Sequence, residues 1–205
     1  MERPCNVIVA GVGGQGNLVS GRVLAEAAVL AGYRPVIGET FGASRRGGTV
    51  FTHVRIGIDE VGPLIPAGAA SLILGLEPME SLRAAISFAS KITTIVLSTS
   101  PVQTLQSLSG QTKYPPVSDV LEAVSALCPA TYPVELSGAL RQTSGRLVLN
   151  SFVLGAAAAL DSLPMSSSQI RESVANLMLP KDSNLAAFDN GFKDLEQRKL
   201  RGTKV

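Results

Sequence analysis

The sequence predicts a single α/β domain with a mixed, mostly parallel sheet and helices on both faces. Apolar runs of strand length alternate with helix-length segments as far as residue 134 of the 205, which is the pattern of strand–helix–strand units. The first unit has a Rossmann-like start, because its strand ends in a glycine-rich turn. After Asn150 only helical patterns follow. We therefore assign one domain to residues 1–205, in which residues 150–205 form a helical segment packed on the rest.

The composition favours the same fold class. Hydrophobic residues make up 45% of the chain, but aromatic residues only 4%, and there is no Trp. The core must therefore consist of Ala, Val, Ile and Leu, which is typical of sheets covered on both faces.

The first unit comprises a strand at Cys5–Ala10, a turn at Gly11–Gly16 and a helix at Asn17–Ala31. Glycine reaches positive φ without strain and leaves backbone N–H groups open to a ligand. A helix N-terminus after such a turn can hold an anion. The turn fits the G-x-G-x-x-G pattern of dinucleotide sites, although a turn required only by packing fits it equally.

Further strands and helices follow in alternation. We expect strands at Arg34–Glu39, Thr49–Gly57, Ser71–Leu76, Thr93–Ser98 and Thr131–Val134, and helices at Pro78–Ala89 and Ser118–Leu127. Thr49–Gly57 comes after a glycine-rich loop rather than a helix, so it should run antiparallel or extend an edge. The turn that follows suggests a hairpin into Leu64-Ile65-Pro66.

The last part of the chain predicts three helices, at Asn150–Leu160, Ser166–Leu179 and Asn184–Arg201, with Pro164 and Pro180 between them. Ser166 followed by Gln169 indicates a capping box at the start of the second.

Charge and cysteine content exclude several functions. Lys and Arg total 18 against 16 Asp and Glu, a net charge of +2, and no basic block with aromatic residues suggests nucleic acid. No signal peptide or apolar stretch of ~18 residues is visible, so we expect a cytoplasmic protein without a membrane span.

Cys5 and Cys128 lie too far apart in the sequence for an iron–sulfur cluster or zinc motif. We expect buried free thiols and no metal site.

A second glycine loop contains Ser44-Arg45-Arg46-Gly47-Gly48. Its arginines could clamp a phosphate or carboxylate, be solvated, or pair with Glu39 or a partner protein. Loops at the carboxyl ends of the first two strands share one edge of an open α/β sheet. We therefore expect both glycine loops to meet in one crevice. Glu39 lies somewhat later than the ~20 residues after the first turn at which a dinucleotide site has its acidic residue, so a dinucleotide site stays an alternative.

His53 is the only histidine, and a lone histidine on a strand is more often structural than catalytic. Glu77 and Pro78 begin a helix, where a carboxylate suits the dipole. No nucleophile elbow is present. The sequence therefore offers no catalytic acid, base or nucleophile.

Several motifs in one order resemble a known family. They are Gly11–Gly16, Ser44–Gly48 continuing to His53-Val54-Arg55, Pro63–Pro66, Leu74–Pro78, Tyr132-Pro133, Asn150, Asn184–Phe188 and Gly191-Phe192. Together they resemble the gamma subunit or domain of 2-oxoacid:ferredoxin oxidoreductases, and most closely the beta-subunit branch of the indolepyruvate enzymes. The resemblance covers nearly the whole chain. Arg45 departs from the family pattern, where Gln is frequent, and Asn17 replaces a more usual apolar residue.

The resemblance implies a non-autonomous oxidoreductase subunit. Its large alpha-type partner would carry thiamine diphosphate and iron–sulfur clusters, decarboxylate a 2-oxoacid (an arylpyruvate such as indolepyruvate), form an acyl-CoA and reduce ferredoxin. Coenzyme A could bind at a shared site. The cofactor-side residues would be Gly11, Gly13, Gly14, Gln15, Gly16, Ser44, Arg45, Arg46, Gly47, Gly48 and His53. The alternatives are an independent Rossmann-like nucleotide-binding enzyme and a structural assembly subunit, and the sequence is compatible with a homo-oligomer.

Overall fold

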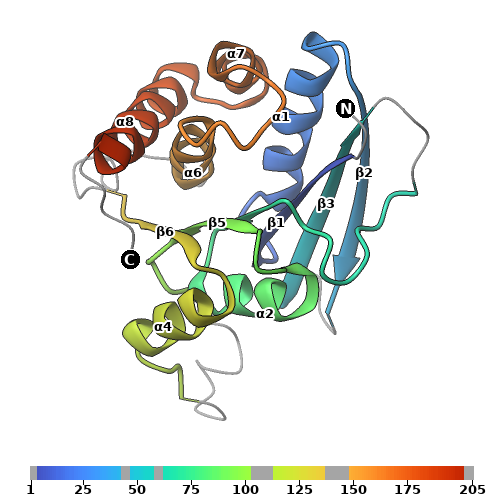
Figure 1. Cartoon of the computed structure of the whole chain (residues 1–205). Coiled ribbons are helices and arrows are strands. Elements are labelled where there is room, and N and C mark those ends of the chain that lie inside the picture. The colour runs from blue at the N-terminus through green and yellow to red at the C-terminus, as the bar shows by residue number, and fades with distance from the viewer. Residues whose placement is uncertain (1–3, 43–46, 58–61, 103–112, 137–147, 201–205) are drawn as a thin grey trace.

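The computed structural model describes residues 4–42, 47–57, 62–102, 113–136 and 148–200. A six-stranded sheet in the order β2-β3-β1-β4-β5-β6 lies between two layers of helices (Figure 1). The strands are β1 Cys5–Val12, β2 Arg34–Phe41, β3 Thr49–Gly57, β4 Leu72–Gly75, β5 Thr94–Ser98 and β6 Ala130–Val134. The helices are α1 Asn17–Leu30, α2 Pro78–Phe88, α4 Val117–Leu127, α6 Val148–Ala158, α7 Ser167–Leu177 and α8 Lys181–Leu200. The predicted α/β fold with a mixed sheet is confirmed.

The antiparallel direction predicted for Thr49–Gly57 is confirmed. β3 runs antiparallel to both β1 and β2, whereas β1, β4, β5 and β6 pair in parallel. The short link between β2 and β3 leaves no room for a crossover helix, which parallel strands need. β3 is not at an edge, however, because it lies between β1 and β2.

The predicted hairpin into Leu64-Ile65-Pro66 is wrong, because residues 62–66 contain no strand. Pro63 and Pro66 have no N–H to donate to a ladder. The segment is held by side chains of β3 instead. Arg55 donates to the carbonyl of Gly62 at 2.9 Å, and the Ile65 N–H donates to His53 Nδ1 at 3.2 Å.

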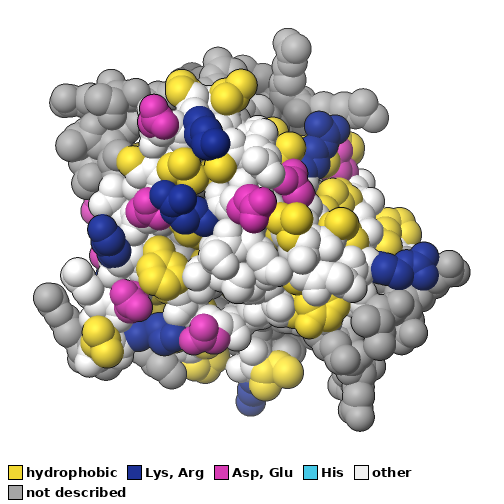
Figure 2. Space-filling model, turned by 90° about the horizontal axis from the view of Figure 1, so that it is seen from above, with side chains coloured by type: hydrophobic (Ala, Val, Ile, Leu, Met, Phe, Trp, Pro, Cys, Tyr) yellow, Lys and Arg dark blue, Asp and Glu magenta, His cyan; other side chains and the backbone are white. Residues whose placement is uncertain are grey.

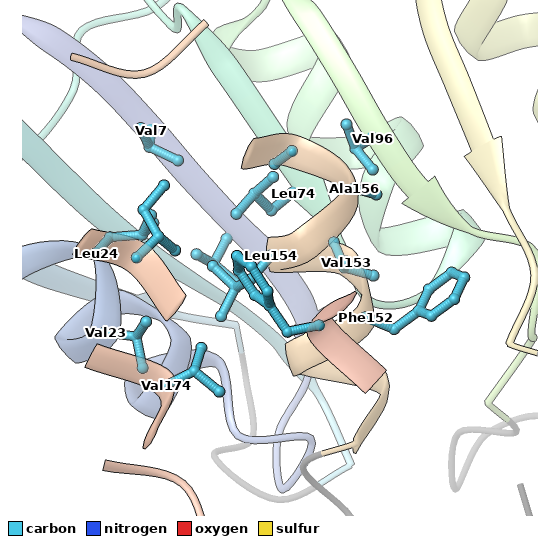
Figure 3. Packing of buried hydrophobic residues seen from close by; sticks show 14 of the residues in the cluster. Val7, Val23, Leu24, Leu74, Val96, Phe152, Val153, Leu154, Ala156 and Val174 are labelled. Carbon is cyan, nitrogen blue, oxygen red and sulfur yellow. The ribbon is translucent and has the colours of Figure 1, made fainter. Parts of the chain in front are cut away.

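The sheet is buried on both faces, as the alternation along β1 shows. Val7 and Val9 belong to the core under α1, α6, α7 and α8, while Ile8 and Ala10 belong to the core under α2 and α4. Figure 3 shows the first core, where side chains of β1, β4 and β5 point toward those of α1 and α6. Continuous burial of β1 explains its largely apolar sequence.

The helices α6 and α8 touch through their backbones at Gly155 and Gly191. A Cβ on Gly155 would lie 2.0 Å from the Phe188 carbonyl oxygen, and one on Gly191 would lie 2.0 Å from that of Phe152. This backbone contact determines how closely α6 and α8 pack against each other. The predicted capping box at Ser166 and Gln169 is confirmed at the start of α7.

The surface carries mixed charges. Seen from above, basic and acidic side chains are interspersed among scattered apolar ones (Figure 2). Arg171 of α7 forms a bidentate ion pair with Asp189 of α8. Cys5 and Cys128 are buried free thiols, as predicted, and burial raises the pKa of Cys5 to about 11. Within the described ranges, no helix has the length and apolar character needed to cross a membrane.

Candidate functional site

The first glycine turn leaves the start of α1 open. Gly14 and Gly16 have φ of 105° and 86°, a region in which residues with a Cβ are strained. Gly16 is the N-cap of α1, no side chain caps the helix, and its first turn has no acidic residue. The first backbone N–H groups of α1 and the positive end of its dipole therefore face the turn. A helix start of this kind can hold an anion through backbone groups alone.

Gln15 braces the turn from within. Its Oε1 accepts from the Val12 N–H at 2.6 Å, and its Nε2 donates to the Leu76 carbonyl at 3.0 Å. Leu76 follows β4, so the amide joins the carboxyl ends of two neighbouring parallel strands. Here β1 leads to α1 on one face and β4 leads to α2 on the other (Figure 1), the kind of switch point at which α/β sheets bind ligands. Gln15, predicted to contact a cofactor, has both amide atoms engaged within the chain.

The two glycine loops meet, as expected. The Gly13 N–H donates to the Gly48 carbonyl at 2.8 Å, and the Gly47 N–H donates to the Gly13 carbonyl at 3.2 Å. Gly47 has a φ of 69°, which allows the close approach. Ser44, Arg45 and Arg46 lie outside the described residues. The two loops are thus joined by backbone hydrogen bonds at Gly13, Gly47 and Gly48.

Two pockets flank the first turn. One, of about 340 Å³, is lined by Val12, Gly13, Gly14, Gln15, Val102, Leu149 and Asn150. The other, of about 310 Å³, is lined by Gly13, Gly14, Gly16, Asn17, Leu18, Glu39, Phe41 and Val50. The structure therefore places Glu39 beside the first glycine turn.

Two asparagines anchor the start of α1. Asn150 of α6 is buried, and its Nδ2 donates to the Gly16 carbonyl at 3.1 Å and to Ser20 Oγ at 2.8 Å. Asn17 donates through Nδ2 to the Val50 carbonyl at 3.0 Å, which ties α1 to β3 and explains a polar residue at this buried place. Because Asn150 is the third residue of α6, the N-termini of α1 and α6 lie side by side.

His53 is not brought to the glycine loops. Its Nδ1 accepts from Ile65, so Nε2 carries the proton and faces Thr40 Oγ1 at 3.1 Å. The ring also meets Phe88 edge-on, with centroids 5.2 Å apart. Burial lowers the pKa of His53 and keeps it neutral. Its observed contacts are structural, as are those of Arg55, whose Nε donates to Asn6 Oδ1 at 3.0 Å.

A buried acidic pair on α2 was not singled out as a site by the sequence. Glu77 caps the helix, as predicted, by accepting from the Glu80 N–H at 2.9 Å, and it also accepts from the Tyr114 hydroxyl. Burial, and then the bond to Glu77, raises the pKa of Tyr114. Glu80 is only 1% exposed. Acidic residues after a helix start suggest solvent-facing caps, so no sequence signal marked Glu80 as buried.

In the described part of the chain, the two pockets present mainly backbone of the first glycine turn, together with the Glu39 carboxylate. Among the described residues, no group of three or more His, Cys, Asp or Glu could hold a metal ion. The arrangement can bind and orient an anionic group at the switch point.

Comparison with known proteins places the chain in a family. The model of the pyruvate ferredoxin/flavodoxin oxidoreductases matches residues 6–193. The chain is 36% identical over 189 residues to the indolepyruvate oxidoreductase subunit IorB of Archaeoglobus fulgidus, covering 91% of this chain and 93% of that protein. It is 34% identical over 191 residues to the subunit of the same name from Thermococcus kodakarensis, covering 92% and 94%.

Solved structures share the fold. The gamma subunit of a keto/oxoacid ferredoxin oxidoreductase from Geobacter sulfurreducens aligns with a TM-score of 0.63 and 20% identity, over 93% of this chain and 98% of that one. The 2-oxoglutarate:ferredoxin oxidoreductase from Magnetococcus marinus, with 2-oxoglutarate, coenzyme A and succinyl-CoA bound, aligns with a TM-score of 0.68 and 20% identity, over 96% of this chain but 32% of that longer one. The predicted resemblance is thereby confirmed, and the chain belongs to the pyruvate ferredoxin/flavodoxin oxidoreductase family.

Proposed function

We propose that this chain is the small subunit of a 2-oxoacid:ferredoxin oxidoreductase that acts on indolepyruvate or a related arylpyruvate. The observation that carries the proposal is the match to IorB subunits over nearly the full length of both chains. A match of this extent includes the glycine turn, the switch point and the C-terminal helices together. The subunit would work only with a large partner.

The partner would supply the cofactors. Thiamine diphosphate would provide the decarboxylation chemistry, and iron–sulfur clusters would pass the electrons to ferredoxin. The two cysteines of this chain are fewer than the four ligands that a cluster needs. The small subunit would then contribute to the wall of the active site rather than to the redox chemistry.

The glycine crevice would bind an anionic part of coenzyme A at the boundary with the partner. Its supporting features are the uncapped start of α1, the paired glycine loops and the adjoining pocket of about 340 Å³. Backbone N–H groups at a helix N-terminus suit phosphate. Arg45 and Arg46, next to Gly47 in the sequence, would add positive charge.

A second candidate function is an independent nucleotide-binding enzyme. The observation that favours it is Glu39, which shares the pocket of about 310 Å³ with the glycine turn, because an acidic residue near such a turn can bind a ribose hydroxyl. Titration of the isolated chain with NAD, NADP and coenzyme A distinguishes the two. A micromolar affinity for NAD or NADP would favour the second function.

Reconstitution tests the main proposal. The chain, the large subunit and their complex are each assayed for indolepyruvate- and coenzyme A-dependent reduction of ferredoxin, with pyruvate and 2-oxoglutarate as competing substrates. We expect turnover by the complex only, with arylpyruvates preferred. Turnover by this chain alone, or a large subunit whose activity does not change on adding it, contradicts the proposal.

Arginine variants separate a binding role from a purely structural one. In the complex, Arg46→Ala should reduce ligand or transition-state binding by ~2 kcal/mol. Arg22→Ala serves as the control, because Arg22 is exposed on α1. Equal activity of both variants would instead indicate a subunit that serves assembly alone.

A further inference from the structure

The pocket of about 340 Å³ is lined by residues that follow two different strands. The glycine turn with Gln15 follows β1, and Val102 follows β5. The strand β4 lies between β1 and β5 in the sheet. Leu76 and Glu77, the two residues after β4, are therefore placed between these two parts of the pocket wall.

Leu76 and Glu77 each accept a hydrogen bond from one part of the wall. The Leu76 carbonyl accepts from Gln15 Nε2 at 3.0 Å, while the Leu76 N–H donates to the Ala10 carbonyl of β1 at 2.8 Å. The Glu77 Oε1 atom accepts from the Val102 N–H at 3.4 Å. Two consecutive residues thus tie the β1 side and the β5 side of the pocket to the end of one strand.

The Glu77 carboxylate makes more contacts than a helix cap requires. Glu77 is 1% exposed, and its Oε2 accepts from the Glu80 N–H at the start of α2. That bond alone completes the cap, for which shorter side chains such as Asp and Ser are preferred. The Oε1 atom accepts from both Val102 and the Tyr114 hydroxyl. A buried carboxylate needs such partners, and the length of the Glu side chain allows it to reach them.

We propose that Glu77 is a positioning residue of this pocket, which sets the place of Val102 relative to Gln15. The inference rests on the proposed function, because it assigns the shape of the coenzyme A pocket to a side chain that does not line it. Glu77 acts through Val102, while the adjacent Leu76 holds Gln15. Loss of the Oε1 bonds should therefore alter binding in the pocket and leave the glycine turn in place.

Amide exchange on the full chain gives the first test, in which Glu77→Asp separates positioning from capping. Asp keeps the charge and caps helices well, but its side chain is one methylene shorter. We expect protection of the Val102 amide to fall about tenfold, in the range of one lost bond to a charged group. Protection of the Glu80 amide should stay, because the cap remains. Glu77→Ser, a second cap without the reach, should give the same result.

The reconstituted complex gives the second test. Glu77→Asp should raise the KM for coenzyme A about tenfold with kcat within about twofold, because the pocket wall moves while the chemistry stays in the partner. Glu122→Asp is the matched control, since Glu122 is exposed on α4, and both of its constants should equal those of the native complex.

Three results overturn the inference. They are native protection of Val102 in Glu77→Asp, an equal loss of protection at Val102 and Glu80, and a native KM for coenzyme A in that variant. The proposed function fails separately, if the native complex shows no coenzyme A-dependent turnover. Exchange of the Val102 and Glu80 amides still decides in that case whether Glu77 holds the pocket wall.

Discussion

Gln15 and Leu76 join the carboxyl ends of β1 and β4, two neighbouring parallel strands whose following helices cover opposite faces of the sheet. The Gln15 Nε2 donates to the Leu76 carbonyl across a sequence separation of 61 residues, while its Oε1 accepts from Val12. The Gln15 side chain thus fixes the position of the glycine turn relative to the ends of β1 and β4. Gln15 therefore stabilises the glycine turn through its hydrogen bonds and also lines the pocket beside the turn.

Gln15→Ala should loosen the first glycine turn. The substitution removes two hydrogen bonds and leaves the Leu76 carbonyl without this donor, which costs ~1–3 kcal/mol. Urea denaturation measures the loss of unfolding free energy. Gln197→Ala, at an exposed position of α8, is the matched control and should lie within ~0.5 kcal/mol of the native chain. Equal stability of the two variants would mean that the Gln15 bonds contribute nothing.

Gly11→Ala should perturb the same turn by crowding. A Cβ there would lie 2.6 Å from Asn17 Oδ1 and 2.9 Å from Gln15 Oε1, so both amides would have to move. We expect weaker binding of coenzyme A by the complex, and a stability loss of ~1–3 kcal/mol. Calorimetric titration and denaturation measure the two effects. Unchanged values for both would show that the turn adapts.

Gly191→Ala should separate α8 from α6. The added Cβ would overlap the Phe152 carbonyl oxygen, and helix backbones cannot yield as a flexible side chain can. The loss of unfolding free energy should be ~3 kcal/mol or more. Gly62→Ala controls for the general effect of removing a glycine, because a Cβ there meets nothing within 4 Å. A Gly191→Ala variant as stable as this control would contradict the backbone contact.

His53 should make stability depend on pH. Burial lowers its pKa from the ordinary 6.5, so below that value the unfolded chain binds a proton that the folded chain does not. Its contribution is therefore complete above about pH 6.5 and decreases as the pH falls toward the lowered pKa. The unfolding free energy measured between pH 8 and 5 should fall more steeply for the native chain than for His53→Gln. Parallel pH curves would show that His53 titrates normally.

The sequence predicted most elements because their signals are local. The capping box of Ser166 and Gln169 spans one turn, and the bounds of Thr49–Gly57 follow from an alternation that neighbouring residues suffice to reveal. The glycine turn at Gly11–Gly16 could be identified because positive φ selects glycine wherever the chain folds. The meeting of the two glycine loops was also predictable, since it follows from a general rule about the carboxyl edge of α/β sheets.

Other features depend on contacts between distant segments, which no local pattern encodes. The residue alternation along Thr49–Gly57 is the same for an inner and an edge strand, so it does not determine the place of β3 between β1 and β2. The hairpin predicted into Leu64-Ile65-Pro66 is absent, and the segment is held instead by hydrogen bonds from Arg55 to Gly62 and from Ile65 to His53.

By itself, the sequence determined the order of strands and helices, the glycine turns and the family, because these depend on residue types at short spacing. The tertiary structure decided the strand order, the bracing role of Gln15 and the burial of Glu80 in the first turn of α2. These features depend on which face of the sheet each helix covers. Helix placement brings together side chains that are far apart in the chain, and only packing of the core determines that placement.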